Sequence, residues 1–144
     1  MRTSALRRFT PLPKTGKRAE ASRRARHQAF GQILARSRWR CEGCGVSSRE
    51  VPCAWHHVAG RPGSGMCLGP IADSAELTTA LCMDDPRTGR QGCHSRVHAN
   101  PQGELAEKLL RQAYIRLGGK ADGVECDATG WREMIRQVVR ELEA

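Results

Sequence analysis

Apolar residues recur at helical spacing between residues 17 and 38, a segment that contains no proline. Two overlapping stripes fit this spacing: Ala25, Ala29 and Ile33, or Phe30, Ile33 and Leu34. The other positions of the segment are mostly basic or polar. The pattern predicts a basic helix with a thin apolar stripe, preceded by a flexible arm at residues 1–16.

Two further helices are predicted from residue 100 onward. Asn100 followed by Pro101 is typical of a helix start, with an N-cap and then proline at the first helical position. The helix that follows ends at Gly118 and Gly119, and its apolar positions are Leu105, Leu109, Ala113 and Leu117. The last helix is amphipathic, and its apolar positions are Trp131, Ile135, Val138 and Leu142.

Short elements are predicted between these helical ends. Residues 51–58 are typical of a strand, and residues 77–81 of a second extended or helical piece. Residues 59–65 and 83–92 are rich in glycine, proline and polar side chains, which predicts loops. A helix is expected to start within residues 93–98.

The composition indicates that aliphatic burial alone does not hold the fold. Leu, Ile, Val and Phe make up 24 of the 144 residues, below the ~20% at which charged chains normally fail to fold by hydrophobic burial. Seven Cys and five His instead indicate stabilisation by metal or by disulfides. Residues 1–13 lack the apolar stretch of a secretory signal, and no apolar run approaches a membrane span of ~20 residues. We therefore expect a cytoplasmic protein, whose cysteines are metal ligands or plain buried thiols.

Basic residues are concentrated toward the N-terminal end. Residues 1–40 hold 12 Lys and Arg against one acidic residue, whereas residues 41–144 hold 12 against 14. This excess predicts a polyanionic partner, although a solubilising tail has the same composition. The side chains expected to contact nucleic-acid phosphates are Arg7, Arg8, Lys14, Lys17, Arg18, Arg23, Arg24 and Arg26.

Four cysteines have a spacing that indicates a zinc site. Cys41 and Cys44 form a Cys-x2-Cys turn, and a more widely spaced pair follows at Cys82 and Cys93. Four thiolates bind zinc tetrahedrally, which predicts a structural Zn²⁺, with unliganded thiols as the alternative. The remaining cysteines have no partner at this spacing and are expected to be buried thiols: Cys53, Cys67 and Cys126.

Four of the five histidines fall in the same window as these cysteines. His94 and His98 are four residues apart, so on a helix both imidazoles face one way, the spacing of two ligands to one metal ion. His56 and His57 are adjacent, so on a strand they point to opposite faces. One of them can bind a metal while the other faces a substrate; additional zinc ligation or surface histidines are the alternatives.

The ordered set of motifs resembles the HNH nuclease family, and most of all its small phage-type members with a four-cysteine zinc. The motifs, within residues 41–98, are Cys41-x2-Cys44, Trp55-His56-His57-Val58, Leu81-Cys82 and Cys93-His94-x3-His98. The resemblance implies a ββα-metal fold, in which two strands and a helix grip one catalytic divalent ion beside the zinc. The expected fold class is α+β, with this zinc-stapled core at 41–100, a basic arm and helix at 1–40, and two C-terminal helices at 101–144.

The resemblance also implies a role for each histidine of the window. His57 is the general base, and His56, His94 and His98 hold the catalytic ion, which is Mg²⁺ or another divalent metal. The implied activity is that of an endonuclease, which nicks or cuts double-stranded DNA, in the host cytoplasm if the chain is phage-encoded. The family's middle Asn, which braces the general base, is missing, because the single Asn of the chain is Asn100. The candidates to replace it are Glu76, Thr78 and Thr79.

Two other functions fit part of the pattern. A zinc-stapled DNA-binding module without catalysis accounts for the basic arm and the four cysteines, but not for His57 beside His56 or for His94 with His98. An RNA-directed nuclease with the same site is a further alternative, because the motif does not identify the sugar. No membrane partner is expected, and no oligomeric state is predicted.

Overall fold

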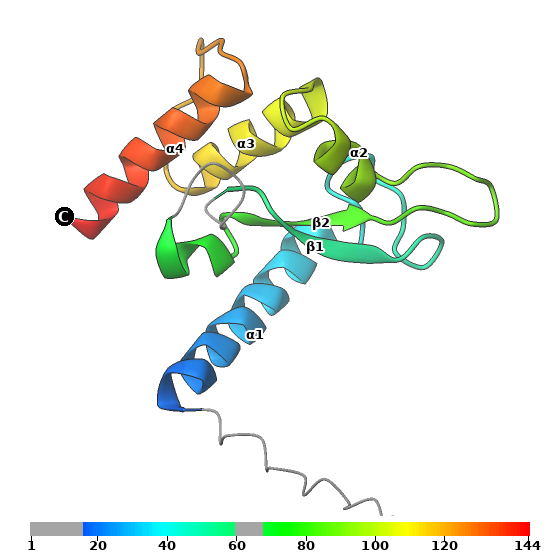
Figure 1. Ribbon diagram of the computed structural model, residues 1–144, viewed down its shortest axis with the longest axis horizontal. Helices are drawn as coiled ribbons and strands as arrows, with labels where there is room; N and C mark the ends of the chain where they lie inside the picture. The colour runs from blue at the N-terminus through cyan, green and yellow to red at the C-terminus, as the bar shows by residue number, and fades with distance from the viewer. Residues whose placement is uncertain (1–15, 60–67) are drawn as a thin grey trace, which may run out of the picture.

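The computed structural model describes residues 16–59 and 68–144, and within them it is an α+β fold (Figure 1). These residues form four α-helices, one short 3-10 helix (η1) and a two-stranded antiparallel sheet. In chain order the elements are α1 (Lys17–Ser37), β1 (Cys53–His57), η1 (Gly69–Asp73), β2 (Thr78–Cys82), α2 (Cys93–Ala99), α3 (Glu104–Arg116) and α4 (Ala128–Glu143). In the described part of the chain, no helix combines the length and the apolar character that a membrane crossing requires.

The sheet is covered on both sides. Cys53 pairs with Cys82 at one end of the sheet and His57 pairs with Thr78 at the other. Helix α1 packs against β2 and η1 on one side, and α2 packs against β2 and α3. Figure 1 shows α1 on one side of the sheet and α2, α3 and α4 on the other. All of β2 is therefore buried, whereas β1 is half-buried along its whole length.

Helix α1 confirms the helix predicted for residues 17–38. Ala29 and Ile33 are buried, whereas Ala25 is exposed and Phe30 is 42% exposed, so only the C-terminal part of the first predicted stripe faces the sheet. The described side chains before Ala29 are all exposed, and this half of α1 projects away from the body (Figure 1). The helix ends because Arg38 and Trp39 adopt left-handed φ angles of 52° and 59°, which turn the chain toward the first cysteine pair.

The prediction that Asn100 and Pro101 start a helix is wrong. Asn100 ends α2, and its carbonyl accepts a hydrogen bond from the Gly103 N–H at 3.1 Å, which closes a tight turn. Gly103 then caps α3, and a Cβ at this residue would lie 2.5 Å from Asn100 Nδ2. The turn therefore delays the helix start to Glu104.

The last helix is also offset from its predicted apolar stripe. Its buried positions are Ala128, Trp131, Ile135 and Val139. Val138 is half-buried at the edge of this face, and Leu142, in the last turn, is 60% exposed. The cause is the helical repeat of 3.6 residues, which brings Val139 rather than Val138 onto the face that Ile135 occupies.

One main core extends from the sheet to the C-terminal helices. Its fully buried side chains are Leu77, Leu81, Leu109, Leu110 and Ile135. A smaller cluster lies beneath α1, where Ala29 and Ile33 meet Ala75 and Ala80. The C-terminal helices therefore pack on the same core that supports the sheet.

Candidate metal centre and its surroundings

The four cysteines predicted to bind zinc lie together. The Sγ atoms of Cys41, Cys44, Cys82 and Cys93 are all within 4.8 Å of one another. Cys41 and Cys44 come from the turn that follows α1, Cys82 from the end of β2 and Cys93 from the start of α2. The cluster joins three segments that are far apart in sequence, and its four sulfur atoms form a donor set suitable for a structural zinc ion.

Backbone amides surround the sulfur atoms of this cluster. Cys41 Sγ accepts hydrogen bonds from the N–H groups of Gly43 at 3.3 Å and Cys82 at 3.2 Å, and Cys82 Sγ accepts one from Cys93 at 3.3 Å. Burial alone would raise the pKa of the Cys44 thiol, but the N–H of Val46 and the neighbouring cysteines lower it to about 7. These contacts favour the thiolate, the form that binds a metal, at Cys44, whereas burial and the neighbouring cysteines raise the pKa of Cys82 and Cys93.

Two further cysteines lie outside the cluster and are less buried than predicted. Cys53 and Cys126 are both half-buried, and Cys67 lies outside the described residues. Burial and the nearby cysteines of the cluster raise the pKa of Cys53 to about 11, so this thiol stays protonated near neutral pH. Its sequence neighbour Ala54 points to the opposite face of β1, because side chains alternate along a strand.

Three of the predicted histidines form a second cluster. A ring nitrogen of each of His56, His94 and His98 lies within 4.8 Å of the others. Their ring centroids are 4.7 to 5.7 Å apart. His56 reaches the cluster from β1, and α2 supplies the other two from successive turns. The convergence expected from their four-residue spacing is therefore present in the structure.

The environment of this cluster favours neutral imidazoles at His56 and His94. Burial, followed by repulsion from the other three histidines of the window, lowers the pKa of His56 to about 4. Burial and the charge of His98 also lower the pKa of His94, against the opposing effect of Asp84. Neutral imidazole is the form that binds metal ions. Three nitrogen donors fit a transition-metal ion better than Mg²⁺, which prefers oxygen ligands.

His57 points away from this cluster and contacts a residue that sequence analysis missed. It is the last residue of β1, and its Nε2 lies 2.9 Å from Oδ1 of Asp73, the last residue of η1. Both side chains are about one quarter exposed. One feature of the sequence could have indicated this contact: Asp73 is the only acidic residue between Glu50 and Glu76.

Two of the three candidates to replace the missing Asn have side-chain contacts elsewhere, and the third has a contact through its backbone. The Thr78 hydroxyl donates to the Ala72 carbonyl at 3.4 Å, and the Thr79 hydroxyl donates to Glu42 at 2.7 Å. The carbonyl of Glu76 accepts from Arg116. Among the described residues, the structure places the carboxylate of Asp73 against His57.

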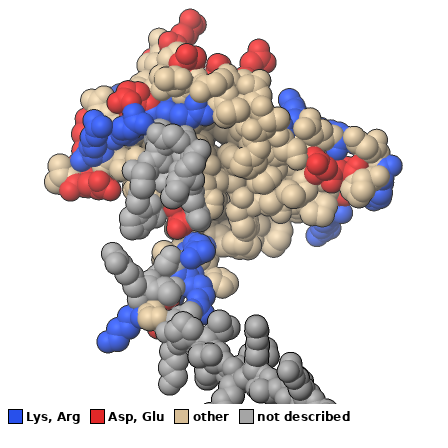
Figure 2. All heavy atoms as spheres, viewed as in Figure 1, with Lys and Arg blue, Asp and Glu red and all other residues tan. Residues whose placement is uncertain are grey.

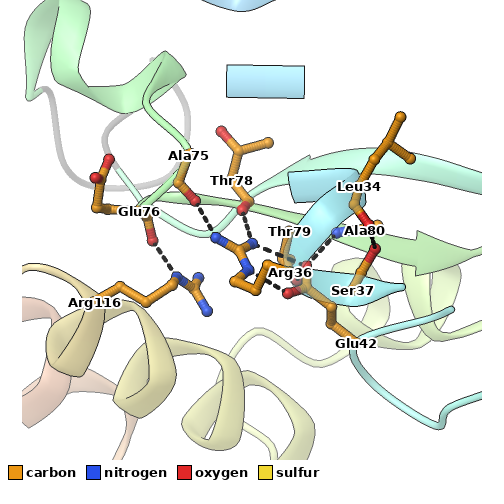
Figure 3. Close-up of polar contacts among 10 residues, drawn as sticks. All are labelled: Leu34, Arg36, Ser37, Glu42, Ala75, Glu76, Thr78, Thr79, Ala80 and Arg116. Carbon is orange, nitrogen blue, oxygen red and sulfur yellow. Dashed lines mark hydrogen bonds and ion pairs between the residues drawn. The ribbon is translucent and has the colours of Figure 1, made fainter. Parts of the chain in front are cut away.

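A polar network fastens α1 to the cysteine turn and to the sheet (Figure 3). Arg36 donates to both carboxylate oxygens of Glu42, which lies between Cys41 and Cys44. The same guanidinium donates to the carbonyls of Ala75 at 2.6 Å and Thr78 at 2.8 Å. Glu42 in turn accepts from the backbone N–H of Ala80 at 2.8 Å, so the network spans three parts of the fold.

Part of the predicted phosphate-contacting set lies on the projecting half of α1. Lys17, Arg23, Arg24 and Arg26 are exposed there. Arg18 belongs to α1, but its side chain is outside the described part, as are Arg7, Arg8 and Lys14. Figure 2 shows Lys and Arg atoms along α1 and at both ends of the body, with a broad uncharged area between them.

No protein-family model, curated protein or solved structure matches the chain. Function is therefore inferred from the side-chain geometry of the two clusters, from His57 and its partner, and from the placement of the basic residues.

Proposed function

We propose that the protein is a metal-dependent endonuclease of the HNH type, which hydrolyses phosphodiester bonds of double-stranded DNA. The observation that carries the proposal is the divergence of two adjacent histidines. His56 joins His94 and His98, while His57 faces Asp73 on the other side of β1. The antiparallel strands followed by α2 also have the order of elements that a ββα-metal site requires.

The proposed reaction is hydrolysis at phosphorus. The oxygen of a water molecule forms a bond to phosphorus, and the bond from phosphorus to the 3′-oxygen breaks. His57 takes a proton from the attacking water, and the departing 3′-oxygen takes one from solvent, which leaves a 5′-phosphate and a 3′-hydroxyl. An imidazole suits this role near neutral pH. A divalent ion bound by the three-histidine cluster would supply stabilisation of the negative charge that develops on the phosphate and leaving oxygen.

The position of His57 supports its assignment as the base. Side chains of adjacent strand residues point to opposite faces. A base and a metal ligand that are neighbours in sequence can therefore flank one phosphate only where the strand bends or ends. His57 is the last residue of β1, and Val58, which follows it, lies outside the strand. A phosphate placed at this end would lie between His57 and the face of β1 on which His56, His94 and His98 would hold the ion.

The basic residues of α1 support DNA as the substrate. Phosphate contacts from Lys and Arg supply affinity that does not depend on base sequence. The exposed cations of α1 lie on the part of the helix that projects from the body (Figure 1). This arrangement fits a nuclease with a backbone-tracking arm.

The main alternative is a zinc-stapled DNA-binding module without catalysis. The four-cysteine cluster and the basic helix favour it, because neither requires a reaction. It assigns no role to the three-histidine cluster or to the contact between His57 and Asp73.

An assay across substrates separates these functions. Purified wild-type protein is incubated with supercoiled plasmid, linear duplex and single-stranded RNA, with Mn²⁺, with Mg²⁺ or with EDTA. We expect EDTA-sensitive nicking of the plasmid and slower or no cleavage of RNA. Binding to DNA without cleavage under any metal condition supports the module instead, and preferential cleavage of RNA identifies an RNA-directed nuclease.

A further inference from the structure

We propose that Asp73 is a positioning residue for His57. This inference rests on the proposed function and adds a residue to its site. The carboxylate of Asp73 holds the imidazole of His57 by its Nε2 and so presents Nδ1 as the atom that takes the proton from water.

The chemistry of the contact determines which nitrogen carries hydrogen. His57 Nε2 and Asp73 Oδ1 are 2.9 Å apart, a normal hydrogen-bond length. An ionised carboxylate only accepts hydrogen bonds, so Nε2 must be the donor. In the neutral ring the proton-accepting lone pair then lies on Nδ1. A carboxylate partner also stabilises the imidazolium that forms once the proton has been taken.

The fold holds Asp73 in place from the strand opposite His57. In the sheet, His57 pairs with Thr78. The buried Thr78 hydroxyl donates to the carbonyl of Ala72, the residue before Asp73. The N–H of Ser74, after Asp73, donates to Ile71 at 2.9 Å and closes η1. Hydrogen bonds therefore hold the residues on both sides of Asp73, so its side chain needs little reordering to contact His57.

The network of Figure 3 fixes the segment that follows Asp73. Arg36 binds the carbonyls of Ala75 and Thr78, and Arg116 binds that of Glu76 at 2.9 Å. Two arginines thus hold the chain between η1 and β2 through its backbone. In this proposal, the carboxylate of Asp73 and the two backbone-binding arginines supply the bracing that the resemblance assigns to the missing Asn.

The test uses full-length, zinc-loaded protein with Asp73→Ala and Asp73→Asn, and Asp122→Ala as a control at an exposed turn. Steady-state nicking gives kcat and KM separately, and metal content and Mn²⁺ affinity are measured on each variant. Proton NMR of the ring N–H region adds a readout that does not depend on activity. A ring N–H bound to a carboxylate gives a protected low-field resonance, assigned to His57 by its absence in His57→Ala.

Asp73→Ala is expected to lower kcat ~10–100-fold, the range for removing a partner that orients an active group, with KM, metal content and Mn²⁺ affinity near wild type. The low-field resonance should disappear. Asp73→Asn keeps a neutral acceptor but lacks the charge that stabilises the imidazolium, so it should retain a shifted resonance and show a measurable loss in kcat of up to ~10-fold. Asp122→Ala should match wild type in both readouts.

Two results would overturn the inference while leaving the nuclease proposal intact. One is wild-type kcat in Asp73→Ala, and the other is an unchanged low-field resonance in that variant. If Asp73→Ala does not fold, as judged by loss of zinc, an Asp73→Asn protein with unchanged kcat and resonance overturns the inference equally. Wild-type protein that shows the resonance but cleaves no nucleic acid contradicts the proposed function itself, and the positioning role with it.

Discussion

Two nitrogens of Arg36 donate hydrogen bonds to the carboxylate of Glu42: Nε lies 2.6 Å from Oε1, and Nη2 lies 3.0 Å from Oε2. Arg36 lies in the last turn of α1, and Glu42 lies within the Cys-x2-Cys turn. The pair therefore connects the basic helix directly to the turn that carries Cys41 and Cys44. Arg36 and Thr79 both lower the pKa of Glu42 by hydrogen bonding, against the opposing effect of burial. One side chain thus sets how α1 meets the candidate site.

Arg36→Ala should destabilise the protein by about 2–4 kcal/mol. The substitution leaves a largely buried carboxylate without its cation, and it removes the donor from two backbone carbonyls. Urea unfolding of zinc-loaded protein measures the loss. Arg140→Ala removes an exposed arginine of α4 and should change the free energy of unfolding by less than about 0.5 kcal/mol. Equal effects of the two substitutions would show that the network contributes no more than a surface charge does.

Loss of zinc should unfold the protein. The chain is poor in aliphatic residues, and binding of a structural zinc contributes ~10 kcal/mol or more in small domains. Cys41→Ser should yield insoluble or molten protein, whereas Cys126→Ser, outside the cluster, should yield folded protein with wild-type zinc content. Elemental analysis of the purified proteins measures the zinc, and wild-type protein without tightly bound zinc would contradict this role for the four cysteines.

Mn²⁺, Co²⁺ or Ni²⁺ should support faster cleavage than Mg²⁺ at equal concentration. The three-histidine cluster offers nitrogen donors only, and imidazole binds these ions better than it binds Mg²⁺. His98→Ala should weaken activation by the metal, so that part of its activity returns as the Mn²⁺ concentration is raised. His27→Ala removes the one histidine outside the window and should leave the metal dependence unchanged. A metal titration curve for His98→Ala identical to that of wild type would rule out this cluster as the activating site.

The basic N-terminal half of α1 should contribute DNA affinity that does not depend on base sequence. The triple variant Arg23→Ala, Arg24→Ala and Arg26→Ala should weaken binding to all duplexes. It should also flatten the slope of log K against log salt by about 0.9 for each phosphate that the variant no longer neutralises. The matched control replaces three arginines of the C-terminal helices, Arg111, Arg136 and Arg140. Fluorescence anisotropy at several salt concentrations measures both slopes, and an unchanged slope in the α1 variant would show that these side chains do not touch DNA.

Local spacing predicted much of the site. Two ligands in a Cys-x2-Cys turn, or two histidines one helical turn apart, are placed by backbone geometry that holds in any fold. The convergence of His94 with His98 and the pairing of Cys41 with Cys44 were therefore predictable. The partner strand and the helix α2 then only had to bring these local pairs together.

Contacts that depend on tertiary packing were not predictable in this way. Asp73 and His57 are separated by 16 positions, and no local repeat indicates that η1 folds back onto the end of β1. In the sequence, Glu42 is a polar residue between two predicted metal ligands. In the structure, its carboxylate accepts hydrogen bonds from both Arg36 and Thr79. The predicted helix start at Asn100 is wrong for the opposite reason. The sequence signal there is local and strong, but the turn closed by the Gly103 N–H delays the start of the helix to Glu104.

The single-turnover rate of DNA nicking, measured for wild type and His57→Ala at saturating DNA and Mn²⁺, tests the central claim most directly. Wild type should nick supercoiled plasmid in an EDTA-sensitive reaction, and His57→Ala should be slower by ~10²-fold or more, the range for removing a positioned general base. Zinc content, Mn²⁺ affinity and DNA affinity should stay at wild-type values in that variant. Equal rates for the two proteins, or no cleavage by fully zinc-loaded wild type, would contradict the role of His57 as the base of a nuclease.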